Sequence, residues 1–147
     1  MWYTNYNSRK GDDLAANNFA AITFWYGAME RSIRIEGKVE KVSEEEATTY
    51  YHSRPRSSQI GAWSSNQSSE IDSREELEMQ ELAVVKRFEG VEVIPKPPHW
   101  GGYRLIPNRI EFWKGRASRM HDRISFSAIS VDGDKERTKW TIKRLQP

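Results

Sequence analysis

The sequence contains no cysteine, so it offers no disulfide framework, no thiol nucleophile and no thiolate ligand for a metal ion. No apolar run approaches the roughly 18 residues of a membrane-spanning helix, and no stretch resembles a signal peptide. A large excess of positive or negative charge is missing too, because the chain has 23 basic and 21 acidic residues and a net charge of +2. This balance gives no bulk electrostatic reason to expect nucleic acid or a membrane as partner. We expect a soluble, cytoplasmic protein.

Aromatic residues are plentiful by contrast. They make up 12% of the chain and include six tryptophans, which argues against disorder because such side chains must be buried, stacked or used in binding. With 147 residues the chain is long enough for a core, and we expect one domain over residues 1–147.

Capping signals and apolar periodicity predict most of the secondary structure. Ser43 and Ser73 each precede a glutamate three residues on, the capping box that opens a helix. Helices are predicted over 9–16 (capped by Ser8), from 43 to about 53 and from 73 to about 89. Strands are predicted near 1–6, 19–26, 31–42, 103–106, 109–113, 124–131 and 138–145, the last two forming a hairpin around Asp132-Gly133.

Burial is also predicted from the pattern. The almost continuously apolar run 19–26 predicts a central strand buried on both faces, and the alternation along 31–42 predicts an antiparallel strand with one wet face. The helix from Ser73 should end at Gly90 and bury a stripe made of Leu77, Leu82, Val85 and Phe88. Residues 60–63 form a short apolar piece ahead of a polar loop, 64–72. This order predicts a mainly β fold with packed helices, a closed or split antiparallel barrel.

A break at Gly115 separates a strand-like segment from a group of basic residues. Arg119, His121 and Arg123 lie two apart, so they share one face if the chain re-enters a strand there. Two arginines around a histidine suit an anion, a phosphate or an electron-rich ring. A solvated polar edge strand explains the same residues equally well.

The segment from Tyr50 to Ser58 combines a phenol, a guanidinium and hydroxyls. Tyr50 and Arg54 are four apart and stack on one face of a helix end. Ser58 follows Pro55, where we expect free backbone N–H groups, and together these features suit a phosphate. The alternative is that Arg54 and Arg56 only offset the dipole at a helix C-terminus.

A third polar group is Ser8-Arg9-Lys10, flanked by Tyr3 and Thr4. At a helix N-terminus it could hold a phosphate, or it could be surface charge on a short helix. Gln67-Ser68 add an amide and a hydroxyl from the polar loop.

Other chemistry finds little support. The three histidines have no zinc-ligand spacing, so we expect no metal site, and the chain lacks a nucleophile elbow, a dinucleotide fingerprint and a P-loop. Aromatics interleaved with arginines could suit single-stranded nucleic acid, a minority interpretation at this net charge.

Taken together, these pieces resemble the pyridoxine/pyridoxamine 5′-phosphate oxidase family. The matching segments follow the family's order and span almost the whole chain: Tyr3–Lys10, Tyr51–Trp63, Gln67–Ser69, Trp100–Tyr103, Ile110–Trp113, Arg119–Arg123 and Arg144–Pro147. The resemblance implies an FMN-binding split β-barrel that works as a homodimer with flavin sites at the interface. It also implies oxidation of pyridoxamine or pyridoxine 5′-phosphate to pyridoxal 5′-phosphate, with O2 as electron acceptor.

The resemblance also implies roles for individual residues. FMN contacts would be Tyr3, Thr4, Arg9, Lys10, Gln67, Ser68, Trp113 and Arg123. The grip on the substrate phosphate would be Tyr50, Arg54 and Ser58. Arg119 and His121 would lie over the pyridine ring of the substrate as the catalytic pair.

The chain departs from the family pattern in three ways. The family carries an upstream segment with phosphate ligands that this sequence lacks, so we expect a barrel truncated at its N-terminus. Ser32 stands where a flavin-contacting glutamine is usual, and Met120 replaces a leucine. The alternative to an oxidase is therefore a non-catalytic paralogue or fragment that binds pyridoxal phosphate or FMN.

Overall fold

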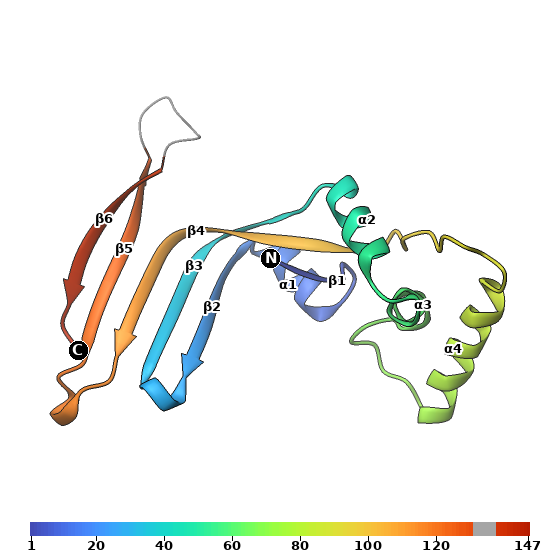
Figure 1. Cartoon of the computed structure of the whole chain (residues 1–147), viewed down its shortest axis with the longest axis horizontal. Helices are drawn as coiled ribbons and strands as arrows, with labels where there is room; N and C mark the ends of the chain where they lie inside the picture. The colour runs from blue at the N-terminus through green and yellow to red at the C-terminus, as the bar shows by residue number, and fades with distance from the viewer. Residues whose placement is uncertain (131–137) are drawn as a thin grey trace. The chain divides into compact units, whose positions relative to one another are not determined.

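The computed structural model describes residues 1–130 and 138–147, which form strands and four α-helices (Figure 1). The helices are α1 (Arg9–Ala16), α2 (Glu44–Ser53), α3 (Arg56–Ser64) and α4 (Arg74–Arg87), with 3-10 turns η1 (Gly27–Met29) and η2 (Ala117–Arg119). The strands are β1 (Trp2–Asn5), β2 (Phe19–Tyr26), β3 (Arg31–Lys41), β4 (Trp100–Lys114), β5 (Asp122–Ser130) and β6 (Thr138–Leu145). They pair in the order β2-β3-β4-β5-β6, with β1 on β4. None of the described helices has the length and apolar character needed to cross a membrane.

The chain divides into two compact units. The first consists of residues 1–17 and 40–104 and holds β1 and the four helices. The second consists of residues 18–39 and 105–147 and holds β2, β5 and β6. Strands β3 and β4 have residues in both units.

The first unit has an aromatic core. Tyr51 and Ile94 are fully buried, and Phe88 and Trp100 are each 5% exposed. The same cluster includes Ile60 and Ala62 of α3. The apolar piece predicted at 60–63 is therefore part of a helix, which the sequence interpretation missed. Its first turn is polar and follows Pro55, so it lacks the side-chain cap by which α2 and α4 were recognised.

The two predicted capping boxes form. The Ser43 hydroxyl accepts a hydrogen bond from the Glu46 backbone N–H, and Ser73 does the same for Glu76, each at 3.1 Å. Ser8 precedes α1 as predicted but does not cap it with its side chain, because its hydroxyl donates to the Asn5 carbonyl at 2.7 Å instead.

The buried stripe predicted for α4 is partly wrong. Leu82 is 67% exposed and Val85 is 45% exposed, whereas Val84 and Phe88 pack on the core. Leu77, Val84 and Phe88 follow steps of seven and four, so the helix turns that line of side chains inward. The helix stops near Gly90 as predicted, where φ is +72°.

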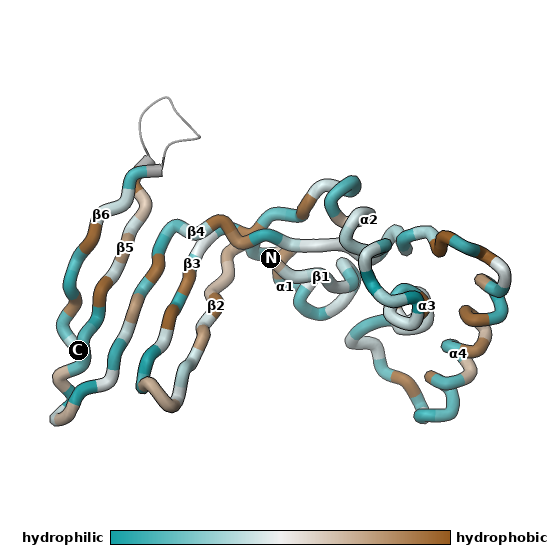
Figure 2. Tube along the Cα trace, viewed as in Figure 1, coloured by the Kyte–Doolittle hydropathy of each residue, from teal (hydrophilic) through white to brown (hydrophobic). Residues whose placement is uncertain are grey.

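The prediction of a central, doubly buried strand at 19–26 is wrong. Strand β2 forms, but it lies at the end of the strand order and pairs, among the described strands, with β3 alone. Figure 2 shows apolar residues spread along this strand, and Phe19 and Trp25 are 58% and 60% exposed. The apolar run indicates a tendency to be buried, but within the described chain no element covers both of its faces.

The remaining strands were predicted more closely. Strand β3 alternates, with Gly37 and Val39 buried between exposed Lys38 and Glu40. The two strands expected at 103–106 and 109–113 are one continuous strand, β4, that passes through Pro107. Strands β5 and β6 pair antiparallel as expected, whereas the predicted turn at Asp132-Gly133 and the expected end of the first strand at Val131 lie outside the described residues.

Candidate functional site

Lys10 links helix α1 to strand β1 and to the polar loop that follows α3. Its ammonium donates to the Thr4 hydroxyl at 3.0 Å and to the Gln67 side-chain oxygen at 2.9 Å. Thr4 also bonds directly to Gln67. Thr4 is 5% exposed, whereas Lys10 and Gln67 are open to solvent. The structure therefore brings together three of the residues predicted to contact FMN and leaves their outer side open.

Two further predicted FMN contacts lie near this group in sequence. Arg9 is exposed at the first position of α1 and makes no ion pair with any described residue. Ser68 is exposed and adopts a left-handed backbone with φ of +72°, which turns the polar loop next to Gln67. Both side chains are available to a ligand.

Tyr3, the remaining predicted contact in this unit, belongs to an aromatic stack. Its ring lies parallel to that of Tyr50, with centroids 3.8 Å apart, and 5.4 Å from that of Trp100. Tyr3 pairs with Gly102 across β1 and β4, and a Cβ atom at Gly102 would lie 2.8 Å from the Tyr3 ring. The glycine therefore lets the tyrosine lie flat against the strand.

Arg54 lies on the same stack. Its guanidinium is 5.0 Å from the centroid of the Trp100 ring, a cation–π contact. Its Nη1 atom is buried and has no hydrogen-bond partner among the described residues. Because a buried guanidinium N–H without an acceptor is costly, this atom is suited to an incoming anion. The ring centroid of Tyr50, which is 43% exposed, lies 6.3 Å from that of the same indole, so two of the three predicted grip residues border Trp100.

Ser58 differs in part from expectation. Its backbone N–H is not free, because it donates to the Pro55 carbonyl at 2.9 Å in the first turn of α3. The side chain is partly exposed and remains available. Only the hydroxyl of Ser58 is therefore a candidate ligand group.

In the second unit, Trp113 and His121 are in contact. Their ring centroids are 4.8 Å apart. The Nδ1 atom of His121 accepts a hydrogen bond from the Arg116 backbone N–H at 3.2 Å. In the neutral ring this places the proton on Nε2, so His121 presents a donor on its other side.

Arg119 does not share a strand face with His121 and Arg123, because the chain does not re-enter a strand until after His121. It ends the 3-10 turn η2 with φ of +63°, and β5 begins only at Asp122. The Asp122 carboxylate accepts from Arg116 at 2.8 Å and from Arg144 at 2.7 Å, and these bonds lower its pKa. Asp122 thus ties the turn to the C-terminal strand and leaves Arg119 exposed.

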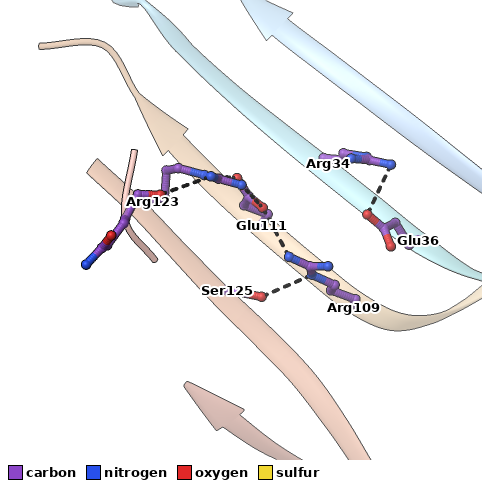
Figure 3. A network of polar contacts seen from close by, with 7 residues as sticks. Arg34, Glu36, Arg109, Glu111, Arg123 and Ser125 are labelled. Carbon is purple, nitrogen blue, oxygen red and sulfur yellow. Dashed lines mark hydrogen bonds and ion pairs between the residues drawn. The ribbon is translucent and has the colours of Figure 1, made fainter. Parts of the chain in front are cut away.

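Arg123 is held by a carboxylate that the sequence interpretation did not single out (Figure 3). Its Nε and Nη2 atoms donate to the two oxygens of Glu111 at 2.8 and 3.1 Å. The pKa of Glu111 is lowered, first by this hydrogen bond, and the pKa of Arg123 is raised by the same partner. Arg109 approaches the carboxylate at 3.5 Å.

A pocket of about 480 Å³ adjoins Trp113 in the second unit. Its lining is mainly apolar and includes Phe112, Ile124 and Ser32. Across β2 and β3, Ser32 pairs with Trp25, whose ring lies 5.8 Å from that of Trp113. The small side chain at position 32 thus lies in the pocket wall beside two indole rings.

Sequence reasoning missed Trp100 and Glu111 as parts of the site. Both stood inside the quoted motifs, Trp100–Tyr103 and Ile110–Trp113, so the signal was present. Their contacts join β4 to α2 and to β5 and could not be derived from spacing.

Comparison with known proteins identifies the family. Residues 1–86 match the profile described as pyridoxamine 5′-phosphate oxidase, and residues 100–147 match the pyridoxine 5′-phosphate oxidase C-terminal dimerisation region. Pyridoxine/pyridoxamine 5′-phosphate oxidases from Trichormus variabilis and Burkholderia vietnamiensis are 50% and 52% identical over 147 residues. This chain spans 65% and 66% of their respective lengths.

Two solved structures resemble the fold. PhzG from Burkholderia lata, solved with tetrahydrophenazine-1-carboxylic acid, superposes with a TM-score of 0.83 at 28% identity, covering 99% of this chain and 67% of its own. A pyridoxamine 5′-phosphate oxidase-related, FMN-binding protein from Nostoc punctiforme has a TM-score of 0.68 at 12% identity, covering 99% and 71%. They confirm the predicted split-barrel fold with packed helices. The chain belongs to the pyridoxamine 5′-phosphate oxidase family.

Proposed function

We propose that this protein binds FMN and oxidises pyridoxamine or pyridoxine 5′-phosphate to pyridoxal 5′-phosphate, with O2 as the final electron acceptor. The observation that carries the proposal is the buried Nη1 atom of Arg54 beside the aromatic stack, which has no hydrogen-bond partner in the described part of the chain. A phosphate oxygen would satisfy this N–H with a charge-assisted hydrogen bond. The Tyr50 and Ser58 hydroxyls would complete the grip.

The residues of the first unit suit the phosphate end of FMN. Lys10 supplies a cation, Thr4 a hydroxyl and Gln67 an amide, and the three side chains already bond to one another. Side chains that are already held in place by bonds to one another lose little entropy when an anion binds. Arg9 and Ser68 are exposed near them, and Tyr3 offers a ring for stacking.

Residues of the second unit suit the flavin ring and the reacting part of the substrate. We propose that Trp113 and Arg123 contact FMN, and that Arg119 and His121 hold the pyridine ring. Because the His121 Nδ1 atom already accepts a hydrogen bond, its neutral ring would donate from Nε2 to a substrate oxygen. This tautomer favours His121 as an orienting donor over a role as the base.

Bound FMN would supply the acceptor for the hydride that leaves the substrate carbon. The alcohol substrate also loses its hydroxyl proton and becomes the aldehyde. The amine becomes an imine that water hydrolyses to aldehyde and ammonia, and O2 is reduced to hydrogen peroxide in either case. The task of the protein is then to clamp the phosphate and hold the reacting carbon in place.

Assembly and location are part of the proposal. The match of residues 100–147 to a dimerisation region supports a homodimer, and we propose that the flavin sites lie at the subunit interface. We also propose a single split-barrel domain in the cytoplasm.

Reconstitution tests the function. The chain is incubated with FMN, separated from free flavin by gel filtration and assayed for pyridoxal phosphate with each vitamer. We expect a yellow protein with turnover, and Arg54→Ala should raise KM at least tenfold with smaller change in flavin content. A colourless protein without turnover would overturn the oxidase proposal for this chain.

Two alternatives can be tested in the same way. PhzG was solved with a tricyclic carboxylic acid, and a carboxylate could bind Arg54 while the ring stacks on Tyr50. Turnover of reduced phenazine carboxylates, but not of the phosphorylated vitamers, would favour this substrate class. A non-catalytic binding protein is the other alternative, and calorimetry would show it as pyridoxal phosphate binding without flavin uptake.

A further inference from the structure

Glu111 lies among charged side chains on one face of the second unit (Figure 3). Across β4 and β5, Glu111 pairs with Ser125 and Trp113 pairs with Arg123. Because residues two apart on a strand share a face, and so do opposed residues, Glu111, Trp113 and Arg123 all lie on one side. Arg123 is therefore next to both the carboxylate and the indole.

The network around Glu111 contains more positive than negative charge. Arg109 and Arg123 both pair with Glu111, and Arg34 pairs with Glu36, so the residues of these three ion pairs carry a net charge of +1 (3 − 2). The Glu111 side chain is 13% exposed, whereas that of Arg123 is 32% exposed. The Glu111 carboxylate is thus almost enclosed by its neighbours, whereas the Arg123 guanidinium still faces solvent.

The bonds of Arg123 fix its guanidinium plane. Nε and one N–H of Nη2 go to Glu111, and one N–H of Nη1 donates to the Gln146 carbonyl at 3.0 Å. A guanidinium has five N–H groups, so two of them have no partner among the described residues. Their directions are set by the other three, since the group is planar and rigid.

We propose that Glu111 is the positioning residue of the flavin site. It holds the guanidinium of Arg123 beside Trp113 so that the two remaining N–H groups face an acceptor on FMN. Glu111 itself does not touch the cofactor. This inference rests on the proposed function, in which Arg123 contacts FMN.

The alternative is that the ion pair only joins β4 to β5. Both interpretations predict that removing Glu111 lowers stability, so stability does not separate them. They differ in flavin affinity, because a residue that acts through Arg123 loses its influence once Arg123 is gone.

A double-mutant cycle in which FMN affinity is measured tests this proposal. FMN is titrated by fluorescence quenching into the wild type, Glu111→Gln, Arg123→Ala and the double variant, each shown to be folded by circular dichroism. We expect Glu111→Gln to weaken FMN binding about tenfold when Arg123 is present and less than about twofold when it is absent. Arg109→Gln is the matched control, since it removes the other, 3.5 Å, partner of Glu111, and should change affinity less than about twofold.

Each outcome decides a separate point. An equal loss of affinity in both backgrounds would overturn the positioning role, as would an unchanged affinity in Glu111→Gln. If Glu111→Gln does not fold, Glu111→Asp takes its place in the cycle with the same criterion. A wild-type protein that takes up no FMN would overturn the proposed function, and the role of Glu111 with it.

Discussion

The guanidinium of Arg54 rests on the indole of Trp100, with its central carbon 5.0 Å from the ring centroid. Trp100 is 5% exposed and also stacks with Tyr3 and Tyr50, so one buried ring supports three residues of the candidate site. Arg54 is extended at the end of α2 because Pro55 follows it, and this conformation brings its side chain to the ring.

Replacing Trp100 should weaken ligand binding at Arg54 and Tyr50 as well as the packing of the core. Trp100→Leu should lower the free energy of unfolding by roughly 2–4 kcal/mol and weaken pyridoxal phosphate binding by roughly three- to thirtyfold. Trp100→Phe keeps an aromatic face and should lose less affinity. Urea unfolding and calorimetry measure the two effects, and equal affinities for the Leu and Phe variants would contradict a cation–π role.

Alanine substitutions of Arg119 and Arg9 should separate effects on catalysis from effects on FMN binding. Arg119→Ala should lower kcat more than it weakens FMN binding, because its proposed partner is the substrate ring. Arg9→Ala should do the reverse, since the exposed side chain at the start of α1 is proposed to contact FMN. Steady-state kinetics with flavin titration checks both, and the proposed roles would be contradicted by equal effects on flavin affinity.

Replacing two helical glycines of the first unit by alanine should change the stability of the protein in opposite directions. A Cβ at Gly61 in α3 meets no atom within 4 Å, so Gly61→Ala should stabilise the protein by about 0.5–1 kcal/mol. A Cβ at Gly11 in α1 would overlap the backbone carbonyl of Tyr6, so Gly11→Ala should destabilise it by more than about 1 kcal/mol. Urea denaturation of the two variants makes the comparison, and a stabilised Gly11→Ala would show that the turn before α1 can move.

Stability in acid should depend on Glu111. Its pKa in the folded protein lies below the ordinary 4.5, mainly through the hydrogen bond from Arg123. The carboxylate therefore stabilises the fold above about pH 4.5, and this contribution is lost as the pH falls through the folded-state pKa. Glu111→Gln should be less stable than wild type at pH 7, and the difference should shrink towards pH 3. Urea midpoints at several pH values test this, and a constant difference would exclude the linkage.

Local signals predicted local structure well. Ser43 and Ser73 opened helices where the glutamate three residues on can reinforce the first turn. Alternation identified β3, and the resemblance of ordered motifs predicted the family and its fold. Each of these signals depends on residues that are close together in the chain, so a single sequence is enough to find it.

Burial and side-chain partners were harder to predict. An apolar run such as Phe19–Tyr26 does not reveal which elements cover it, and α4 carries enough apolar residues to define two stripes, of which Val84 and Phe88 mark the buried one. Two-residue spacing would put Arg119 on a face with His121 if a strand ran through both, but the positive φ at Ser118 and Arg119 turns the chain before β5. Contacts such as Arg123 with Glu111 depend on strand register, which was not known beforehand.

The position of β2 at the end of the strand order has a practical consequence for work with this protein. No described strand other than β3 pairs with β2, and the side chains of Phe24 and Trp25 on it are exposed. Such an edge can accept an extended chain from another molecule during refolding. Refolding yield should therefore fall as protein concentration rises. Thr23→Lys places a charge next to Phe24 and should restore the yield, because a charge within an apolar strand opposes pairing between chains.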